Sequence, residues 1–338
     1  MVRIIFIFIG LCLSGCTNRR EVQPAFYHWK STLALTDTEV DYLNALKIKR
    51  LYVKFFDVFW DASLQMPAPT ASLVIQRLPE QEIVPCIFIT NQTFKQLADN
   101  QIFMLANRVV LKLEELWLQT QDRTLREVQF DCDWTGATRE RFFQFLQAIQ
   151  QQRPAWLLSV TIRLHQIRDY KQTGVPPVPR GMLMFYNTGD LESWSEDNSI
   201  LNLRLAEGYL TSDALQRYPM PLDVALPIFA WGVLFREGRM IRLLNNLQTA
   251  QLSDTSRFQL LSPQRFEVRQ STFLDGHYLY AGDRLRLESV RAEQLIRSAH
   301  LLRSQLKNQN LTVSFYHLDT ATIKYFPYEA LDAACKAF

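Results

Sequence analysis

Short apolar runs bounded by turn residues alternate along the chain with segments whose apolar residues recur at helical spacing. The apolar runs read as strands because each is of strand length and rich in β-branched and aromatic residues. They predict eight strands, at residues 25–30, 51–60, 83–90, 127–134, 157–164, 182–186, 224–231 and 311–318.

Helical spacing is clearest between the third and fourth predicted strands, where five apolar residues share one face: Ile102, Leu105, Val109, Leu113 and Leu116. Another helix begins after Thr36, which forms a capping box with Glu39. Eight strands with interposed helices predict an α/β fold, a (β/α)8 TIM barrel. The alternative, a doubly wound sheet, usually has fewer strands, and no glycine-rich phosphate loop follows the first strand.

Residues 233–290 break this alternation. They contain a hairpin-like turn around Glu237 and Gly238 and a second one at Asp275 and Gly276. We expect a small α+β insertion after the seventh strand, with the barrel formed by residues 25–232 and 291–338. Insertions of this kind lie on the side of a barrel where substrates bind.

The N-terminus carries a targeting signal. Arg3 precedes an apolar run at residues 4–13, which is too short to cross a bilayer as a helix and fits a signal peptide. The run ends in Leu-Ser-Gly-Cys, which resembles the lipobox of bacterial lipoproteins and implies lipidation of Cys16. We therefore expect a signal peptide at residues 1–15 and a lipidated cysteine with a linker at 16–24; a signal peptide without lipidation is the alternative.

The residues after Cys16 bear on location. Thr17 stands where Asp would favour inner-membrane retention, and Arg19 and Arg20 stand where an acidic surface-export signal would be sought. We expect a protein of the cell envelope, anchored by its lipid to the outer membrane and facing the periplasm.

Charge and cysteine content exclude several other classes. The formal net charge is +3 with both signs interspersed, so no nucleic-acid partner is expected. Cys86, Cys132 and Cys335 lack metal-ligand spacing, and their odd number argues against a disulfide framework. Buried free thiols are expected, although one bridge is open, and neither a metal nor a cofactor is predicted.

The fourth predicted strand carries the most informative polar residues. Strand alternation places Gln129, Asp131, Asp133 and Thr135 on one face, directed into the barrel interior. Two carboxylates on one interior face repel each other, which raises at least one pKa and suits acid/base chemistry. The structural alternative is that one aspartate caps the next helix and the other pairs with Arg163.

Polar residues also follow other strands, where the C-terminal mouth of a barrel lies. With the aromatic side chains near the same rim they could bind a sugar, because aromatic faces stack on sugar rings while polar groups accept and donate hydrogen bonds. The candidate substrate-binding residues are Trp29, Asp57, Asn91, Arg163, His165, Asn187, Asp190 and Trp231.

Two segments resemble family-18 glycoside hydrolases, the chitinases and their relatives. Asp131 and Asp133 match the second and third acids of the signature Asp-x-x-Asp-x-Asp-x-Glu, and residues 184–187 (Met-Phe-Tyr-Asn) resemble its Met-x-Tyr-Asp. The resemblance implies a chitinase-like TIM barrel acting on a glycan, with Asp131, Asp133 and Tyr186 as catalytic residues.

The departures from the signature affect the acidic residues that would carry out catalysis. Val128 replaces the first Asp, Thr135 the catalytic Glu and Asn187 the acid of the second motif. A hydroxyl cannot replace the missing proton donor, so another acid has taken its place or hydrolysis has been lost. Three hypotheses follow: a divergent glycoside hydrolase, which we favour at this point, a glycan-binding lectin without catalysis, and a scaffold with a plugged mouth.

Overall fold

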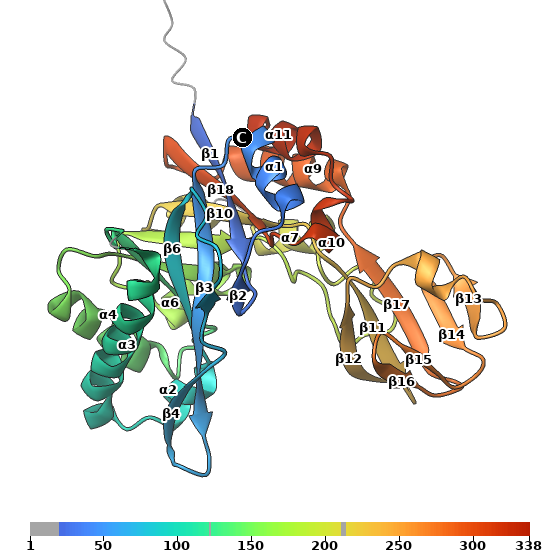
Figure 1. Ribbon diagram of the computed structural model, residues 1–338, viewed down its shortest axis with the longest axis horizontal. Coiled ribbons are helices and arrows are strands. Elements are labelled where there is room, and N and C mark those ends of the chain that lie inside the picture. The colour runs from blue at the N-terminus through green and yellow to red at the C-terminus, as the bar shows by residue number, and fades with distance from the viewer. Residues whose placement is uncertain (1–19, 122, 211–213) are drawn as a thin grey trace, which may run out of the picture.

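The main body is a closed barrel of eight parallel strands (Figure 1). In this computed structural model residues 20–121, 123–210 and 214–338 are described. The barrel strands are β1 (Glu21–His28), β3 (Arg50–Asp61), β6 (Glu82–Ile89), β7 (Glu127–Asp131), β8 (Leu157–Arg163), β9 (Arg180–Met184), β10 (Leu222–Pro227) and β18 (Asn310–Tyr316). Each pairs with the next along the chain, and β1 closes the ring by pairing with both β18 and β3. The predicted TIM barrel and its eight strands are confirmed.

Several strand boundaries differ from the prediction, and those of β1 and β7 affect the linker and the site. β1 begins at Glu21 instead of residue 25, because residues 21–24 pair with residues 310–313 of β18 and so belong to the barrel, not to the expected linker. β7 ends at Asp131, three residues before the predicted end. Asp131 therefore still faces inward, whereas Asp133 belongs to the loop that follows.

Helices surround the barrel, and their bounds follow from local sequence. The capping box predicted from Thr36 and Glu39 starts α1 (Asp37–Ala45), and the apolar face predicted from Ile102 to Leu116 is buried in α3 (Ile102–Trp117). The other helices are α2 (Asn91–Gln96), α4 (Arg139–Gln152), α5 (Leu164–Arg168), α6 (Tyr170–Thr173), α7 (Leu203–Tyr209), α8 (Ala214–Arg217), α9 (Ala292–Arg303), α10 (Thr320–Ile323) and α11 (Tyr328–Lys336), with 3-10 turns η1 (Asp99–Gln101) and η2 (Leu118–Thr120). Among the described residues no helix combines the length and apolarity needed to cross a membrane.

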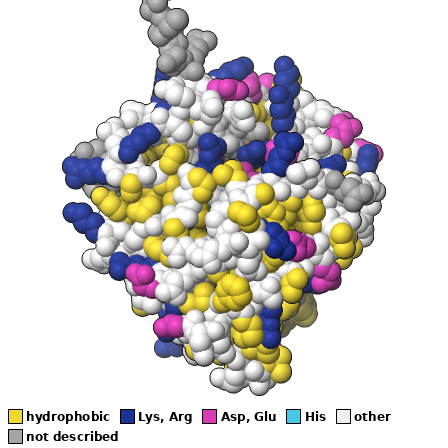
Figure 2. Space-filling view, turned by 90° about the vertical axis from the view of Figure 1, so that its left-hand side faces the viewer, with side chains coloured by type: hydrophobic (Ala, Val, Ile, Leu, Met, Phe, Trp, Pro, Cys, Tyr) yellow, Lys and Arg dark blue, Asp and Glu magenta, His cyan; other side chains and the backbone are white. Residues whose placement is uncertain are grey.

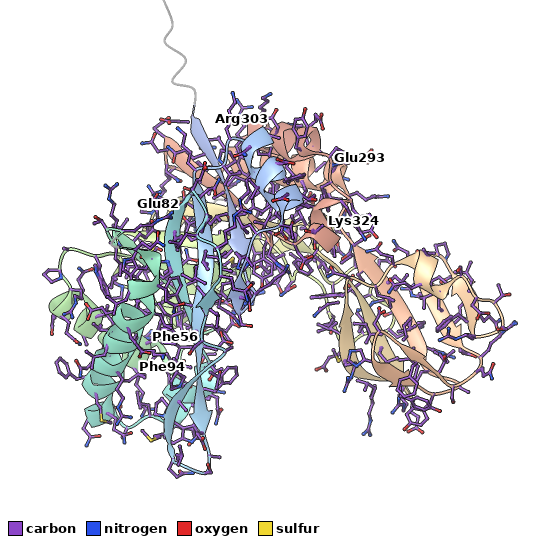
Figure 3. The ribbon with its side chains drawn as sticks, viewed as in Figure 1. Phe56, Glu82, Phe94, Glu293, Arg303 and Lys324 are labelled. Carbon is purple, nitrogen blue, oxygen red and sulfur yellow. The ribbon has the colours of Figure 1, made fainter. Side chains whose placement is uncertain are left out.

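Aromatic side chains fill the layer between barrel and helices. Phe94 of α2 contacts Phe142 and Phe145 of α4 edge-on, with ring centroids 5.4 and 5.7 Å apart. Figure 3 shows Phe94 beside Phe56 of β3 in this layer. Burial of such rings is the main favourable contribution to folding. On the outer side of this layer, hydrophobic side chains are interspersed with Lys and Arg (Figure 2).

Three short strands lie outside the barrel ring, and one of them pairs with the second barrel strand. β4 (Met66–Thr70) pairs antiparallel with the far end of β3 and forms a hairpin that projects beyond the barrel (Figure 1). β2 (Thr32–Leu33) and β5 (Val74–Ile75) form a separate two-stranded parallel pair. The hairpin extends the molecule on the side where the barrel strands end.

The insertion follows β10 and has its own hydrophobic core. Its five-stranded antiparallel sheet has the order β12 (Arg239–Asn245), β11 (Ala230–Arg236), β17 (Arg284–Ser289), β14 (Arg265–Val268) and β13 (Phe258–Ser262). β15 (Thr272–Leu274) and β16 (His277–Leu279) form a hairpin, and η3 (Thr249–Leu252) is a 3-10 turn. The structure thus places strands almost throughout the segment that the sequence predicted as α+β. Ala230 and Trp231, expected in the seventh barrel strand, belong to β11.

The end of the barrel where the strands begin is closed by ion pairs. Arg50 contacts Glu82 at 3.0 Å and Glu127 at 3.2 Å, and Arg180 contacts Asp223 at 3.0 Å. Figure 3 shows Glu82 toward this end of the molecule. Burial raises the pKa of both Glu127 and Asp223, and their arginine partners oppose that rise.

The three cysteines in the described ranges are buried thiols. Cys86, Cys132 and Cys335 are free and buried, as expected from their number and spacing. Burial raises the pKa of each thiol, so none is an activated nucleophile. Cys16 lies outside the described residues.

Candidate functional site

A column of polar side chains lines the barrel interior along β7. Gln129 accepts a hydrogen bond from the Tyr27 hydroxyl at 2.5 Å, and Tyr27 stacks on Tyr52 with centroids 5.0 Å apart. One pleat further along, Asp131 accepts a hydrogen bond from Thr161 of β8 at 2.5 Å. The predicted inward face of this strand is therefore correct for both Gln129 and Asp131.

Arg163 joins the two aspartates at the mouth of the barrel. Its Nε donates to Asp133 Oδ1 at 2.6 Å, and its Nη2 lies 3.5 Å from Asp131 Oδ1. Asp131 is buried, whereas 51% of the Asp133 side chain is exposed. The predicted pairing of an aspartate with Arg163 is confirmed for both acids. Neither caps the following helix, because the N-cap of α4 is Thr138.

The environment of Asp131 has opposing electrostatic effects. Burial raises the pKa of Asp131, Arg163 lowers it, and the neighbouring Asp133 raises it again. Asp57 adds a weaker effect in the same direction, so it lies within electrostatic reach, and Lys54 holds Asp57 through an ion pair of 3.0 Å. The mouth thus contains three carboxyl groups and two cations that are ion-paired or within electrostatic reach of one another: Asp57, Asp131, Asp133, Lys54 and Arg163.

Tyr186 lies beside this charged group. The Arg163 guanidinium carbon is 5.9 Å from the Tyr186 ring centroid, a cation–π arrangement. Burial raises the pKa of Tyr186, so the phenol stays protonated at neutral pH. The structure therefore brings together four predicted residues: Asp131, Asp133, Arg163 and Tyr186.

Aromatic rings form a continuous arc around the mouth. Successive centroids are 5.7 Å apart for Trp29 and Tyr316, 5.5 Å for Tyr316 and Tyr186, 5.7 Å for Tyr186 and Phe229, and 5.0 Å for Phe229 and Trp231. The arc runs from the end of β1 past β18 and β9 to the start of the insertion. Trp29 and Trp231, both predicted binding residues, are its two ends.

The remaining predicted residues occupy the rim. Asn91 opens α2 and accepts a hydrogen bond from Thr138 at 2.6 Å. His165 is exposed on α5, and burial of part of its ring lowers its pKa. Asn187 is exposed with a positive φ of 55°. Asp190 accepts the Glu192 amide at 2.9 Å and stabilises its own loop, so the structure does not join it to the acids around Arg163.

Sequence reasoning missed three residues that organise the site. Phe229 links the two halves of the aromatic arc, and Thr161 orients Asp131. Glu288 accepts the Trp231 indole N–H at 2.8 Å from a strand far along the chain. Glu288 is buried against Arg286, with Nε and Oε1 2.5 Å apart. In the sequence, Arg286 and Glu288 are two charged residues of a strand that looks exposed, so no pattern indicated that Glu288 would hold Trp231.

No group of three or more His, Cys, Asp or Glu side chains within the described ranges is arranged to hold a metal ion. Thr135, at the expected position of the catalytic Glu, is exposed; its amide donates to the Thr138 hydroxyl at 3.0 Å. The residues described here provide charged and hydrogen-bonding groups and stacking surfaces at one mouth.

Comparison with solved structures identifies the fold. The spore cortex-lytic enzyme SleL of Bacillus cereus matches with a TM-score of 0.54 and 15% identity over 95% of this chain and 75% of that one. SleL of Bacillus megaterium gives 0.54 and 14% over 92% and 74%, and a chitinase from Bacteroides thetaiotaomicron gives 0.50 and 11% over 94% and 97%. Neither a family model nor a curated protein sequence matches the chain. At these identities the likeness shows the fold alone, a TIM barrel that this chain shares with these chitinase-like proteins.

Proposed function

We propose that the protein binds a glycan at the C-terminal mouth of the barrel without hydrolysing it. The observation that carries the proposal is the ion pairing of Arg163 with both Asp131 and Asp133, combined with Thr135 at the position of the missing acid. A guanidinium stabilises the charged form of a carboxylate that it contacts, which opposes proton donation, although at Asp131 burial acts in the other direction.

The other candidate acids are unsuited to proton donation in this geometry. Asp57 is paired with Lys54, and Asp190 is engaged with a backbone amide of its own loop. Partial burial lowers the pKa of His165, which disfavours the charged imidazolium that would donate a proton. We infer that none of these three groups takes the place of the acid missing at position 135.

The aromatic arc supports binding. Trp29 and Trp231 are partly exposed at its ends, and their faces can stack on the C–H faces of sugar rings. Asp133 and Asn187, both exposed at the same mouth, can hydrogen-bond sugar hydroxyl or N-acetyl groups. SleL and chitinases, the structural neighbours, are by name enzymes of spore cortex lysis and chitin breakdown, so polymers of N-acetylated amino sugars are the first ligands to test.

Hydrolysis is the second candidate, favoured by one observation. Burial raises the pKa of Asp131, and a carboxyl with a raised pKa can hold a proton for transfer. In this case Asp131 and Asp133 would act as the acid/base pair beside Tyr186.

One experiment distinguishes the two candidates. Purified full-length protein is titrated calorimetrically with chito-oligosaccharides and with peptidoglycan glycan strands, and each mixture is then analysed chromatographically for shorter products. We expect saturable binding and no product. Trp29→Ala should weaken binding by about tenfold, equivalent to ~1.4 kcal/mol. Phe103→Ala, which removes an exposed ring on the outer helix α3, should leave binding unchanged.

Product release would establish the hydrolase instead, and Asp133→Asn should then abolish turnover while the protein remains folded. If no glycan binds and none is cleaved, the proposal is wrong and the barrel is a scaffold.

We also propose that Cys16 is lipidated and anchors the protein in the cell envelope, at the outer membrane with the body facing the periplasm. Support comes from the lipobox-like residues 13–16. Because β1 begins at Glu21, only residues 17–20 would separate the lipid from the barrel, a span of less than about 15 Å. In cells grown with labelled fatty acid, the full chain should be labelled and fractionate with outer membranes, whereas Cys16→Ala should not.

A further inference from the structure

Three aromatic rings lie together on the surface of the insertion, outside the mouth. Phe273 of β15 is 67% exposed, Tyr278 of β16 is 45% exposed and Tyr280 is 51% exposed. Phe273 and Tyr278 are directly opposite across the hairpin with centroids 4.9 Å apart, and Tyr278 and Tyr280 are 5.0 Å apart. We call these three side chains the hairpin platform.

The hairpin holds these rings outward by strand alternation. Leu274 and Leu279, the neighbours of Phe273 and Tyr278, point the other way into the core of the insertion and are buried. The core is thus complete without the three rings, and polar side chains would suit their exposed positions. Contiguous exposed aromatic residues usually mark a binding surface.

Polar groups surround the hairpin platform. The Arg236 guanidinium lies 4.2 Å from the Tyr280 ring centroid and is fixed by two hydrogen bonds to Asp283, of 2.7 and 2.8 Å. At the turn, Gln251 donates to Asp275 at 2.6 Å. Stacking faces edged by amide, carboxylate and hydroxyl groups suit a carbohydrate, whereas an acid and an amide at the edge do not suit insertion into lipid.

The size of the platform also points to a small ligand unit. With about 200 Å² per ring, the three rings expose roughly 300 Å². A stable protein–protein interface needs about 800 Å² on each partner. The platform therefore matches one or two sugar rings better than a second copy of the chain or another protein.

The hairpin platform is attached firmly to the mouth. β11 starts directly after the seventh barrel strand, and Trp231 at its base donates to the buried Glu288. Arg286, paired with Glu288, also donates to the carbonyls of Ser193 and Leu191 in the loop after β9. Figure 1 shows β15 and β16 at the lower edge of the insertion, at the end of the molecule opposite to the start of β1. The hairpin therefore lies toward the same end of the molecule as the barrel mouth.

We propose that Phe273, Tyr278 and Tyr280 form a second carbohydrate-binding site, which stacks on one or two sugar units of a polymer and acts separately from the barrel mouth. The inference rests on the proposed function in one respect, because the polymer is taken to be the one whose sugars enter the mouth. Short oligosaccharides would use the mouth alone, and long strands would use both sites.

The test compares polymer and oligosaccharide binding in the full-length protein. The variant F273A/Y278A/Y280A should bind insoluble chitin and peptidoglycan sacculi on the order of tenfold more weakly in co-sedimentation, with its calorimetric affinity for short chito-oligosaccharides unchanged. Phe103→Ala, whose ring is 60% exposed on α3, is the matched control and should change neither quantity. Thermal unfolding of all variants establishes that the fold is retained.

A second measurement reads the platform directly. Hydroxyl-radical footprinting of the wild-type protein should show Tyr278 and Tyr280 protected by the polymer and not by short oligosaccharides. Unchanged polymer binding of the triple variant, an equal loss in Phe103→Ala, or protection by phospholipid vesicles instead of polymer would overturn the second site. Oligosaccharide binding that persists in any of these cases leaves the proposed function standing, whereas its absence in the wild type contradicts the proposed function itself.

Discussion

The two ends of the barrel both contain arginines between carboxylates, but they differ in what lies around them. At the end where the strands begin, Arg50 contacts Glu82 and Glu127, and the buried Ser159 donates to Glu127 at 2.7 Å. At the mouth, Arg163 contacts one buried and one exposed aspartate beside an arc of aromatic rings. The first end is closed by its ion pairs, and the second leaves polar and aromatic groups available to a ligand.

The comparison shows how one motif can serve stability at one end and recognition at the other. In TIM barrels the loops after the strands carry function, whereas the opposite face contributes to stability. Here an arginine between two acids is present at both ends, so the charge pattern alone does not identify the site. The site is identified by the exposed Asp133 and the neighbouring aromatic rings.

The largest effect is expected when the closed end loses its cation. Arg50→Met leaves Glu127 buried without its partner, and breaking a buried pair in this way costs about 3–5 kcal/mol of unfolding free energy. Urea denaturation at pH 7 measures the loss. Glycan affinity, measured without urea on the folded protein, should not change. A loss of unfolding free energy below about 1 kcal/mol would show that the ion pairs of Arg50 do not stabilise this end of the barrel more than exposed pairs do.

His28, at the end of β1, is expected to make the fold acid-sensitive. Burial, with smaller contributions from Lys30 and His317, lowers the pKa of His28 to about 4, against an opposing effect of Glu39. A lowered histidine pKa means that stability is present above the ordinary value of about 6.5 and is lost as pH falls through about 4, by roughly 3 kcal/mol.

His28→Gln should therefore flatten the decline in unfolding free energy between pH 7 and pH 4, measured by denaturant titration at several pH values. His317 also has a lowered pKa from burial, and Asp319 and Glu39 face it with the opposite effect, so part of the decline should remain. An unchanged pH profile in His28→Gln would contradict the assignment.

A smaller effect is expected at the mouth. Arg163→Met should cost about 2 kcal/mol at pH 7, because the buried Asp131 loses its ion-pair partner while the exposed Asp133 is solvated. The pKa of Asp131 is already raised and should rise further without Arg163. The protonated acid then needs no cation, so the deficit should shrink as pH falls below the folded pKa. A deficit that grows on acidification would contradict this balance.

The smallest effect concerns catalysis. Thr135→Glu restores a carboxyl at the position of the missing acid, next to Asp133. We expect only slow release of product from chito-oligosaccharides, because Arg163 still holds Asp133. Chromatography of long incubations measures it, with Thr135→Gln as the control. Equal release by the wild type and by Thr135→Gln would show that hydrolysis does not depend on this position.

The sequence by itself determined the barrel. Strand-length apolar runs and helix-period segments are local signals, and so are the capping box at Thr36 and the buried face of α3, which the structure reproduces. The inward direction of Gln129 and Asp131 also followed from strand alternation alone, because a period of two fixes which side chains share a face.

Tertiary structure decided where the strands ended and which side chains met. β1 extends back to Glu21 only because β18 lies beside it, and Asp133 leaves the interior because β7 ends at Asp131. The contact of Trp231 with Glu288, the position of Phe229 in the arc and the outward rings of Phe273 and Tyr278 depend on strands distant in sequence. Such contacts arise from packing between elements, and no local pattern encodes them, whereas the elements themselves are set by the period of their own residues.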